Sequence, residues 1–130
     1  MNDHFDKVRT YVLELGYSIS HENQEDGILV VNQDSVGISN LVIGVADPIL
    51  IFEQYIFDVD SSDANILKNL LMKNRDVVHG AFVLDDSGNR VIFRDTLQLE
   101  NLDQNEVEGT LNSLKLLLGE YAEEIIEFSL

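Results

Sequence analysis

The residue types that most often carry catalysis or bind metals are scarce in this chain and poorly spaced. Cysteine is absent, so a thiolate metal site, a disulfide and a thiol nucleophile are all excluded. The three histidines, His4, His21 and His79, are scattered, and no two stand at a metal-ligand spacing. We therefore interpret them as surface residues and expect no bound metal ion.

One acidic segment begins like a calcium-binding loop. Asp58, Asp60 and Ser62 alternate as the first ligands of such a loop do. However, Asp63 stands where the sharp turn needs glycine, and Asn69 stands where a bidentate glutamate is needed. The better interpretation is that these residues cap the N-terminus of a helix.

The sequence also lacks the motifs that bind nucleotides and the residue pattern that acid–base catalysis needs. Gly88 is an isolated turn glycine, and the sequence has neither a phosphate-binding loop nor a dinucleotide fingerprint. The many acidic residues are not set among apolar residues that would separate the pKa values of an acid and a base. The sequence therefore predicts a protein that is not an enzyme, with no catalytic residue and no cofactor.

The strongly acidic composition restricts which kinds of molecule the protein can bind. Eight Lys and Arg residues stand against 24 Asp and Glu residues, a formal net charge of -16, which repels nucleic acid and anionic membrane surfaces. The same charge attracts a basic polypeptide at long range, although solubility alone explains it equally well. We expect a cytoplasmic protein, because no apolar run is long enough to span a bilayer and the start of the chain is unlike a signal peptide.

The apolar residues switch twice between helical and strand-like spacing. This pattern predicts helices over residues 3–15, 63–74 and 104–127 and strands over 28–31, 41–46, 49–57, 81–84 and 90–97, with a weaker strand near 17–20. The order is helix, three strands, helix, two strands, helix, without a linker or a repeat. We expect one α+β domain over residues 1–130, with an antiparallel sheet of about five strands and flanking helices.

The strand expected over residues 49–57 is apolar on both of its faces. Both alternating sets in this segment contain large aliphatic or aromatic side chains. The second face is either covered inside the monomer or exposed as a patch for a second subunit or a client peptide. The sequence leaves both alternatives open.

Several segments resemble the type III secretion chaperone (Tir chaperone) family. They are Leu-Leu-Met-Lys-Asn at 70–74, Gly-Ala-Phe-Val-Leu-Asp-Asp at 80–86, Gly-Asn-Arg-Val-Ile-Phe at 88–93 and Leu-Gln-Leu at 97–99. The YbjN-like proteins are similar in fold and often have no associated secretion system. The resemblance implies a small acidic homodimer that binds a client or partner protein.

The resemblance also implies where the two kinds of contact would lie. The dimer interface would lie on the second helix and the strand 81–84, at Leu67, Leu70, Leu71, Phe82 and Leu84. The client would bind the first helix and the sheet, at Val8, Val12, Phe52, Tyr55 and Phe57. Two functions remain open: a dimeric chaperone or adaptor that holds a client polypeptide, and a stand-alone YbjN-like interaction or regulatory protein without a secretion role.

Overall fold

The computed structural model describes residues 3–129 and has an α+β fold with a single antiparallel sheet in that part of the chain. The elements in chain order are α1 (Asp3–Glu14), β1 (Ser18–Asn23), β2 (Ile28–Gln33), η1 (Asp34–Val36), β3 (Ile38–Ala46), β4 (Ile49–Asp58), α2 (Ala64–Lys73), η2 (Asn74–Asp76), β5 (Ala81–Leu84), β6 (Arg90–Gln98), α3 (Gln104–Glu120) and α4 (Ala122–Ser129). The strand order is β1-β2-β3-β4-β6-β5, and each neighbouring pair is antiparallel.

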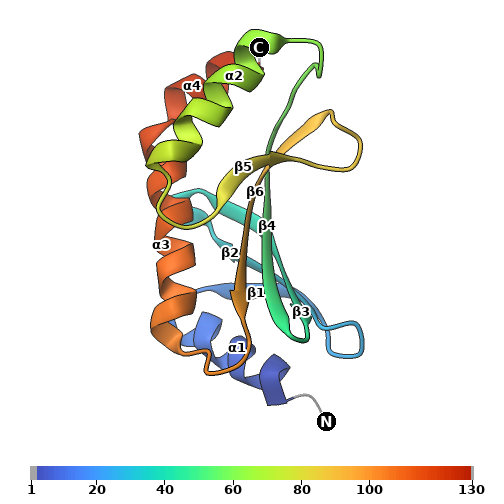
Figure 1. Cartoon of the computed structure of the whole chain (residues 1–130). Coiled ribbons are helices and arrows are strands. Elements are labelled where there is room, and N and C mark those ends of the chain that lie inside the picture. Colours follow the sequence, from blue (N-terminus) through green and yellow to red (C-terminus); the bar gives the residue numbers. More distant parts are fainter. Residues whose placement is uncertain (1–2, 130) are drawn as a thin grey trace.

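The helices lie on one face of the twisted sheet, and the other face has no helix over it within the described residues (Figure 1). Val8 and Val12 of α1 are fully buried, as are Val107 and Leu114 of α3. On the sheet side this core is completed by alternate residues of the central strands, Leu29, Ile43, Leu50, Phe52, Val91 and Phe93. Apolar burial between one layer of helices and one sheet face therefore holds the fold together.

The α+β class, the antiparallel sheet and the flanking helices are confirmed, and two details of the expected order are wrong. Four strands, not three, separate the first two helices, so the sheet has six strands in the described chain. The additional strand is β1, at the place of the weaker expected strand. Its sequence is polar and mostly exposed, so the alternation that marks a half-buried strand is faint.

The expected long last helix is divided at Tyr121 into α3 and α4. The backbone of Tyr121 leaves the helical region, although no proline stands there. Beyond this break the Phe128 ring lies 5.9 Å from the ring of Phe57 on β4, while the Tyr121 ring lies 6.2 Å from that of Phe82 on β5. These aromatic side chains pack against the sheet on both sides of the break between α3 and α4. The helical spacing of the apolar residues does not reveal that break.

A register shift in β4 accounts for part of its two-sided apolar pattern. Leu50, Phe52 and Gln54 are buried at every second position, and the pairing with β6 then shifts between Tyr55 and Phe57. After this β-bulge, Phe57 is buried although it has the opposite parity. Ile51 and Tyr55 remain on the face that has no helix, so that face is exposed and not closed inside the described monomer.

Gly80 allows the chain to enter β5 close to the core. Its φ is +82°, and a Cβ added there would lie 2.5 Å from the Phe93 ring. We expect Gly80→Ala to lower the free energy of unfolding by about 2–5 kcal/mol, through left-handed backbone strain and overpacking. Gly37 is the matched control, because its φ is +83° but no atom of the described residues that could clash lies within 4 Å of an added Cβ. Urea unfolding should show a smaller loss for Gly37→Ala, and equal losses would contradict this account.

The buried side chain of Tyr17 should make the protein less stable at alkaline pH. This side chain is buried, its hydroxyl has no hydrogen-bond partner among residues 3–129, and burial raises its pKa to about 12. Because this value is above the usual pKa of about 10, the neutral phenol stabilises the fold below about pH 10, and that contribution is lost as the pH rises towards 12. Between these pH values we expect the free energy of unfolding to fall more steeply for the wild type than for Tyr17→Phe. Parallel curves from urea titrations would contradict the assignment.

Candidate functional site

The described residues offer no arrangement suited to metal binding. In residues 3–129 no group of three or more His, Asp or Glu side chains is placed to hold a metal ion. The calcium-like segment caps a helix instead: Asp63 Oδ1 accepts a hydrogen bond from the Ile66 N–H at 3.2 Å. Asp60 Oδ1 accepts bonds from the hydroxyl and the N–H of Ser62, which lower its pKa.

An apolar groove of about 370 Å³ lies between helix α2 and the edge strand β5. Leu70 and Phe82 are buried in it, whereas 72% of the Leu71 surface and 41% of the Leu84 surface are exposed. Every lining residue is apolar: Leu67, Leu70, Leu71, Phe82, Val83, Leu84 and Val91. The five residues expected at a dimer interface therefore converge on one groove, and Val83 and Val91 belong to it as well.

The wall of this groove is attached to the rest of the fold by polar contacts. The Asn74 side chain, just after α2, forms two hydrogen bonds with the backbone of Phe82 on β5. The Lys73 ammonium lies 4.8 Å from the centre of the Tyr121 ring and 2.5 Å from Glu124 Oε2 of α4. The end of α2 is thus attached both to β5 and to α4. These contacts hold the wall of the groove in place.

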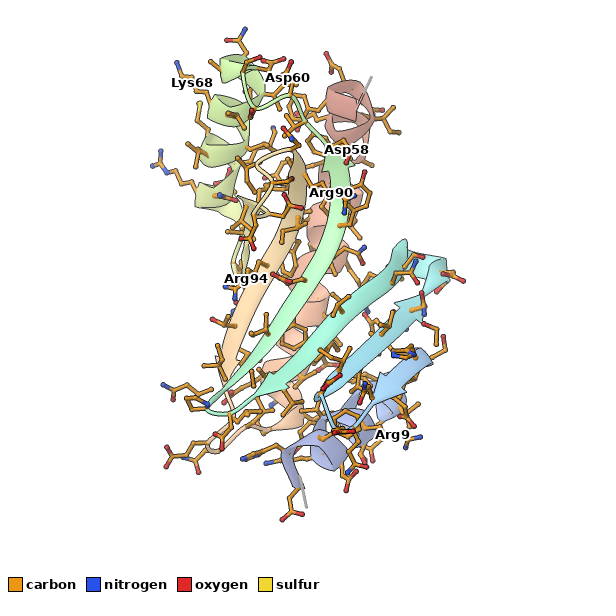
Figure 2. The ribbon with its side chains drawn as sticks, turned by 90° about the vertical axis from the view of Figure 1, so that its right-hand side faces the viewer. Arg9, Asp58, Asp60, Lys68, Arg90 and Arg94 are labelled. Atoms are coloured by element: carbon orange, nitrogen blue, oxygen red, sulfur yellow. The ribbon has the colours of Figure 1, made fainter. Side chains whose placement is uncertain are left out.

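Helix α2, which forms one wall of the groove, contains basic residues but no acidic ones. Lys68, Lys73 and Arg75 are three of the eight basic residues, and α2 itself contains no Asp or Glu. Lys68 and Arg75 are exposed, and Figure 2 shows Lys68 pointing away from the body of the protein. Because the whole chain carries a net charge of -16, these cations reduce the repulsion between two copies that meet at α2.

A second surface is the open face of the sheet, which faces the viewer in Figure 2. Val42, Tyr55, Val83 and Ile92 line a shallow depression of about 500 Å³ on this face, together with polar residues. Arg94 Nε lies 3.1 Å from Glu53 Oε2 on the neighbouring strand. This surface can contact another polypeptide through apolar side chains set between charged ones.

Charged side chains continue along the same face towards the end of β4. The Tyr55 hydroxyl donates to Asp58 Oδ1 at 3.0 Å, and this hydrogen bond raises the pKa of Tyr55. Arg90 Nε lies 4.0 Å from the same carboxylate oxygen. Such exposed pairs contribute little to stability but give the face a defined pattern of charge.

The residues expected to bind a client do not form one accessible surface, because four of the five are buried. Val8, Val12 and Phe52 are fully buried, and only 3% of the Phe57 surface is exposed. All four belong to the core between the helices and the sheet, where α1 contacts α3 and β1 and where Phe57 lies against Phe128 of α4. Only Tyr55 is exposed, with 51% of its surface accessible.

The other residues of the open face cannot be recognised from the spacing of apolar residues in the sequence. Val42 pairs with Glu53 across β3 and β4, and Ile92 pairs with Tyr55 across β4 and β6. Alternation along each strand separates the two faces, but it does not show which face the helices cover. The strand order and register are needed to bring these residues together.

None of the helices in residues 3–129 is long and apolar enough to cross a membrane.

Solved structures with the same fold include YbjN from E. coli, at 15% identity, 92% coverage of each chain and a TM-score of 0.68. The Yersinia pestis type III secretion chaperone SycH, solved in complex with a fragment of YscM2, is 16% identical over 97% of this chain and 99% of its own, with a TM-score of 0.58. A chain of the HopA1–SchA chaperone–effector complex is 10% identical over 99% of this chain and 98% of its own, with a TM-score of 0.62. At these identities the likeness establishes the fold.

Curated protein sequences gave no significant match to the chain. The family model CesT_Tir_1 matches residues 1–130, the whole of the chain. The structure agrees with this match, since chaperones of type III secretion share its helices and antiparallel sheet. The chain therefore belongs to the CesT/Tir family of secretion chaperones, a family of proteins that are not enzymes.

Proposed function

We propose that this protein is a homodimeric, cytoplasmic chaperone or adaptor that holds a client polypeptide and catalyses no reaction. The observation that carries the proposal is the groove between α2 and β5, which is open to solvent and whose described lining residues are all apolar. A groove of this kind, in a family of secretion chaperones, supports association with another chain.

A second copy of this chain is the occupant that best fits the groove. The exposed Leu71 and Leu84 stand beside the buried Leu70 and Phe82, so one patch provides both projecting and receiving apolar surface. A two-fold axis can place the same patch of each copy against the other. The exposed Lys68 and Arg75 also reduce the repulsion between two strongly acidic chains at this point.

The open face of the sheet is the surface that we assign to the client. It remains accessible when the α2–β5 groove is occupied, apart from Val83 and Leu84, which line both surfaces. Its apolar residues would contact apolar side chains of an extended or partly folded polypeptide. Basic residues flanking those side chains would be drawn by the acidic surface, which speeds encounter more than it strengthens the final complex.

A stand-alone interaction or regulatory protein is the second candidate function. The observation in its favour is the TM-score of 0.68 with YbjN, compared with 0.58 and 0.62 for the two secretion-chaperone structures. The identity of the bound polypeptide separates the two candidates. A chaperone holds a secreted protein in a partly unfolded state, whereas a regulatory domain binds a folded partner.

We expect Leu71→Asp to convert the dimer to a monomer, because the substitution places a carboxylate in the centre of an apolar interface. Leu71 is 72% exposed in the single chain, so the substitution should leave the folded monomer intact. Sedimentation equilibrium at micromolar concentration measures the change. Leu116→Asp is the control, since Leu116 is 66% exposed on α3, outside the groove. A monomeric wild type, or a Leu71→Asp variant as dimeric as the control, would argue against the groove as the dimer interface.

The client surface is tested at Tyr55. A polypeptide captured from native cell lysate by the wild type should bind Tyr55→Asp at least about ten-fold more weakly, because a charge replaces an aromatic ring at the centre of the open face. Leu116→Asp should bind that polypeptide as the wild type does. Titration with the purified polypeptide gives the affinities, and circular dichroism checks that both variants are folded. Equal binding by a folded Tyr55→Asp would exclude this face.

A further inference from the structure

The outer edge of β5 has no further strand beside it in the described part of the chain. β5 is the last strand of the sheet and pairs only with β6. In an antiparallel pair, the backbone N–H and C=O groups of alternate residues point away from the partner strand. Phe82 and Leu84 are those residues in β5, because Phe82 bonds to a side chain on the outer side. Such an edge normally offers a template for a strand of another protein.

Asn74 already occupies the middle of this edge. Its Oδ1 accepts a hydrogen bond from the Phe82 N–H at 2.7 Å, and its Nδ2 donates to the Phe82 carbonyl oxygen at 3.1 Å. One carboxamide thus forms with Phe82 the same pair of bonds that a residue of an added strand would form. Within β5 only Leu84 keeps outward backbone groups, and a single residue does not make a ladder.

The position of Asn74 is supported from both sides. It follows Lys73, whose contacts with Tyr121 and Glu124 hold the end of α2. Its own N–H continues the helix by bonding to Leu70 O. Gly80, which cannot carry a side chain beside the Phe93 ring, brings the chain back into β5. The carboxamide is therefore presented to the strand edge by an ordered turn.

We infer that Asn74 closes the β5 edge to strand addition, so that the α2–β5 groove accepts its partner through apolar side chains and not through a shared sheet. The inference rests on the proposed use of this groove for association. It specifies the partner's chemistry: projecting aliphatic or aromatic side chains, as Leu71 and Leu84 of a second copy provide, in place of an unpaired strand. It also gives the protein a means of exposing an apolar groove without inviting open-ended strand pairing.

The first experiment measures amide hydrogen exchange of Phe82 by NMR in the Leu71→Asp background, which keeps the chain monomeric under the proposed function. Asn74→Ala removes the acceptor, so Phe82 should exchange at least about five-fold faster, the factor that one net hydrogen bond represents. Asn74→Asp retains an acceptor for the Phe82 N–H and should keep its exchange slow. Asn69→Ala is the matched control, because the Asn69 carboxamide bonds within α2, to Asn65 O at 2.9 Å.

The second experiment examines the wild type at a concentration where it associates, in a mixture of isotope-labelled and unlabelled copies. We expect contacts between side chains of the groove and none between the α-protons of two β5 strands. Strand-to-strand contacts in the wild type would overturn the inference, as would equal Phe82 exchange rates in Asn74→Ala and Asn69→Ala. If the wild type is monomeric throughout, the proposed dimer fails, while the Phe82 exchange rates still decide whether Asn74 closes the edge.

Discussion

The covering of only one sheet face by helices is the constraint on which the other features depend. Burial of Val8, Leu111 and Phe52 between the two layers provides the main stabilisation, since each large apolar side chain contributes about 1.5–3 kcal/mol when it is fully buried. With the helices on that side, the opposite face of the sheet has no helix over it within the described chain (Figure 1). The bulge in β4 extends the core to Phe57 and leaves Tyr55 on the open side.

The end of the sheet at β5 shows how polar contacts shape an apolar surface. Asn74 attaches the end of α2 to β5, Lys73 attaches it to α4, and the leucines of α2 line one groove together with Phe82. The Tyr121 ring contributes to both attachments, because it lies against Lys73 and against Phe82. Helix α2 is short, and Leu70 is its buried residue, so these contacts help to hold it in place as one wall of the groove.

Most of the fold could be predicted from the sequence. The two errors in that prediction, the number of strands before α2 and the single long last helix, have physical causes. Strand β5 has the expected bounds of 81–84, and α1 and α2 differ from the expected helices by a residue at one or both ends. These segments have strong apolar periodicity or clear caps, such as Asp63. β1 is polar because it is an exposed edge strand, and the break at Tyr121 accompanies packing against Phe82, a residue distant in sequence. Neither feature leaves a periodic signal.

The sequence by itself determined what chemistry is absent and which apolar residues belong together near the second helix. Missing cysteines and scattered histidines are local facts, and Leu67, Leu70 and Leu71 share a helix face by spacing alone. Only the tertiary structure decided that Val8, Val12 and Phe52 are buried while Tyr55 is exposed, because a stripe of apolar residues has the same spacing whether it meets a core or a partner. The pairing of Asn74 with Phe82 was likewise decided by the tertiary fold, since it joins residues across a turn whose path depends on packing against Phe93.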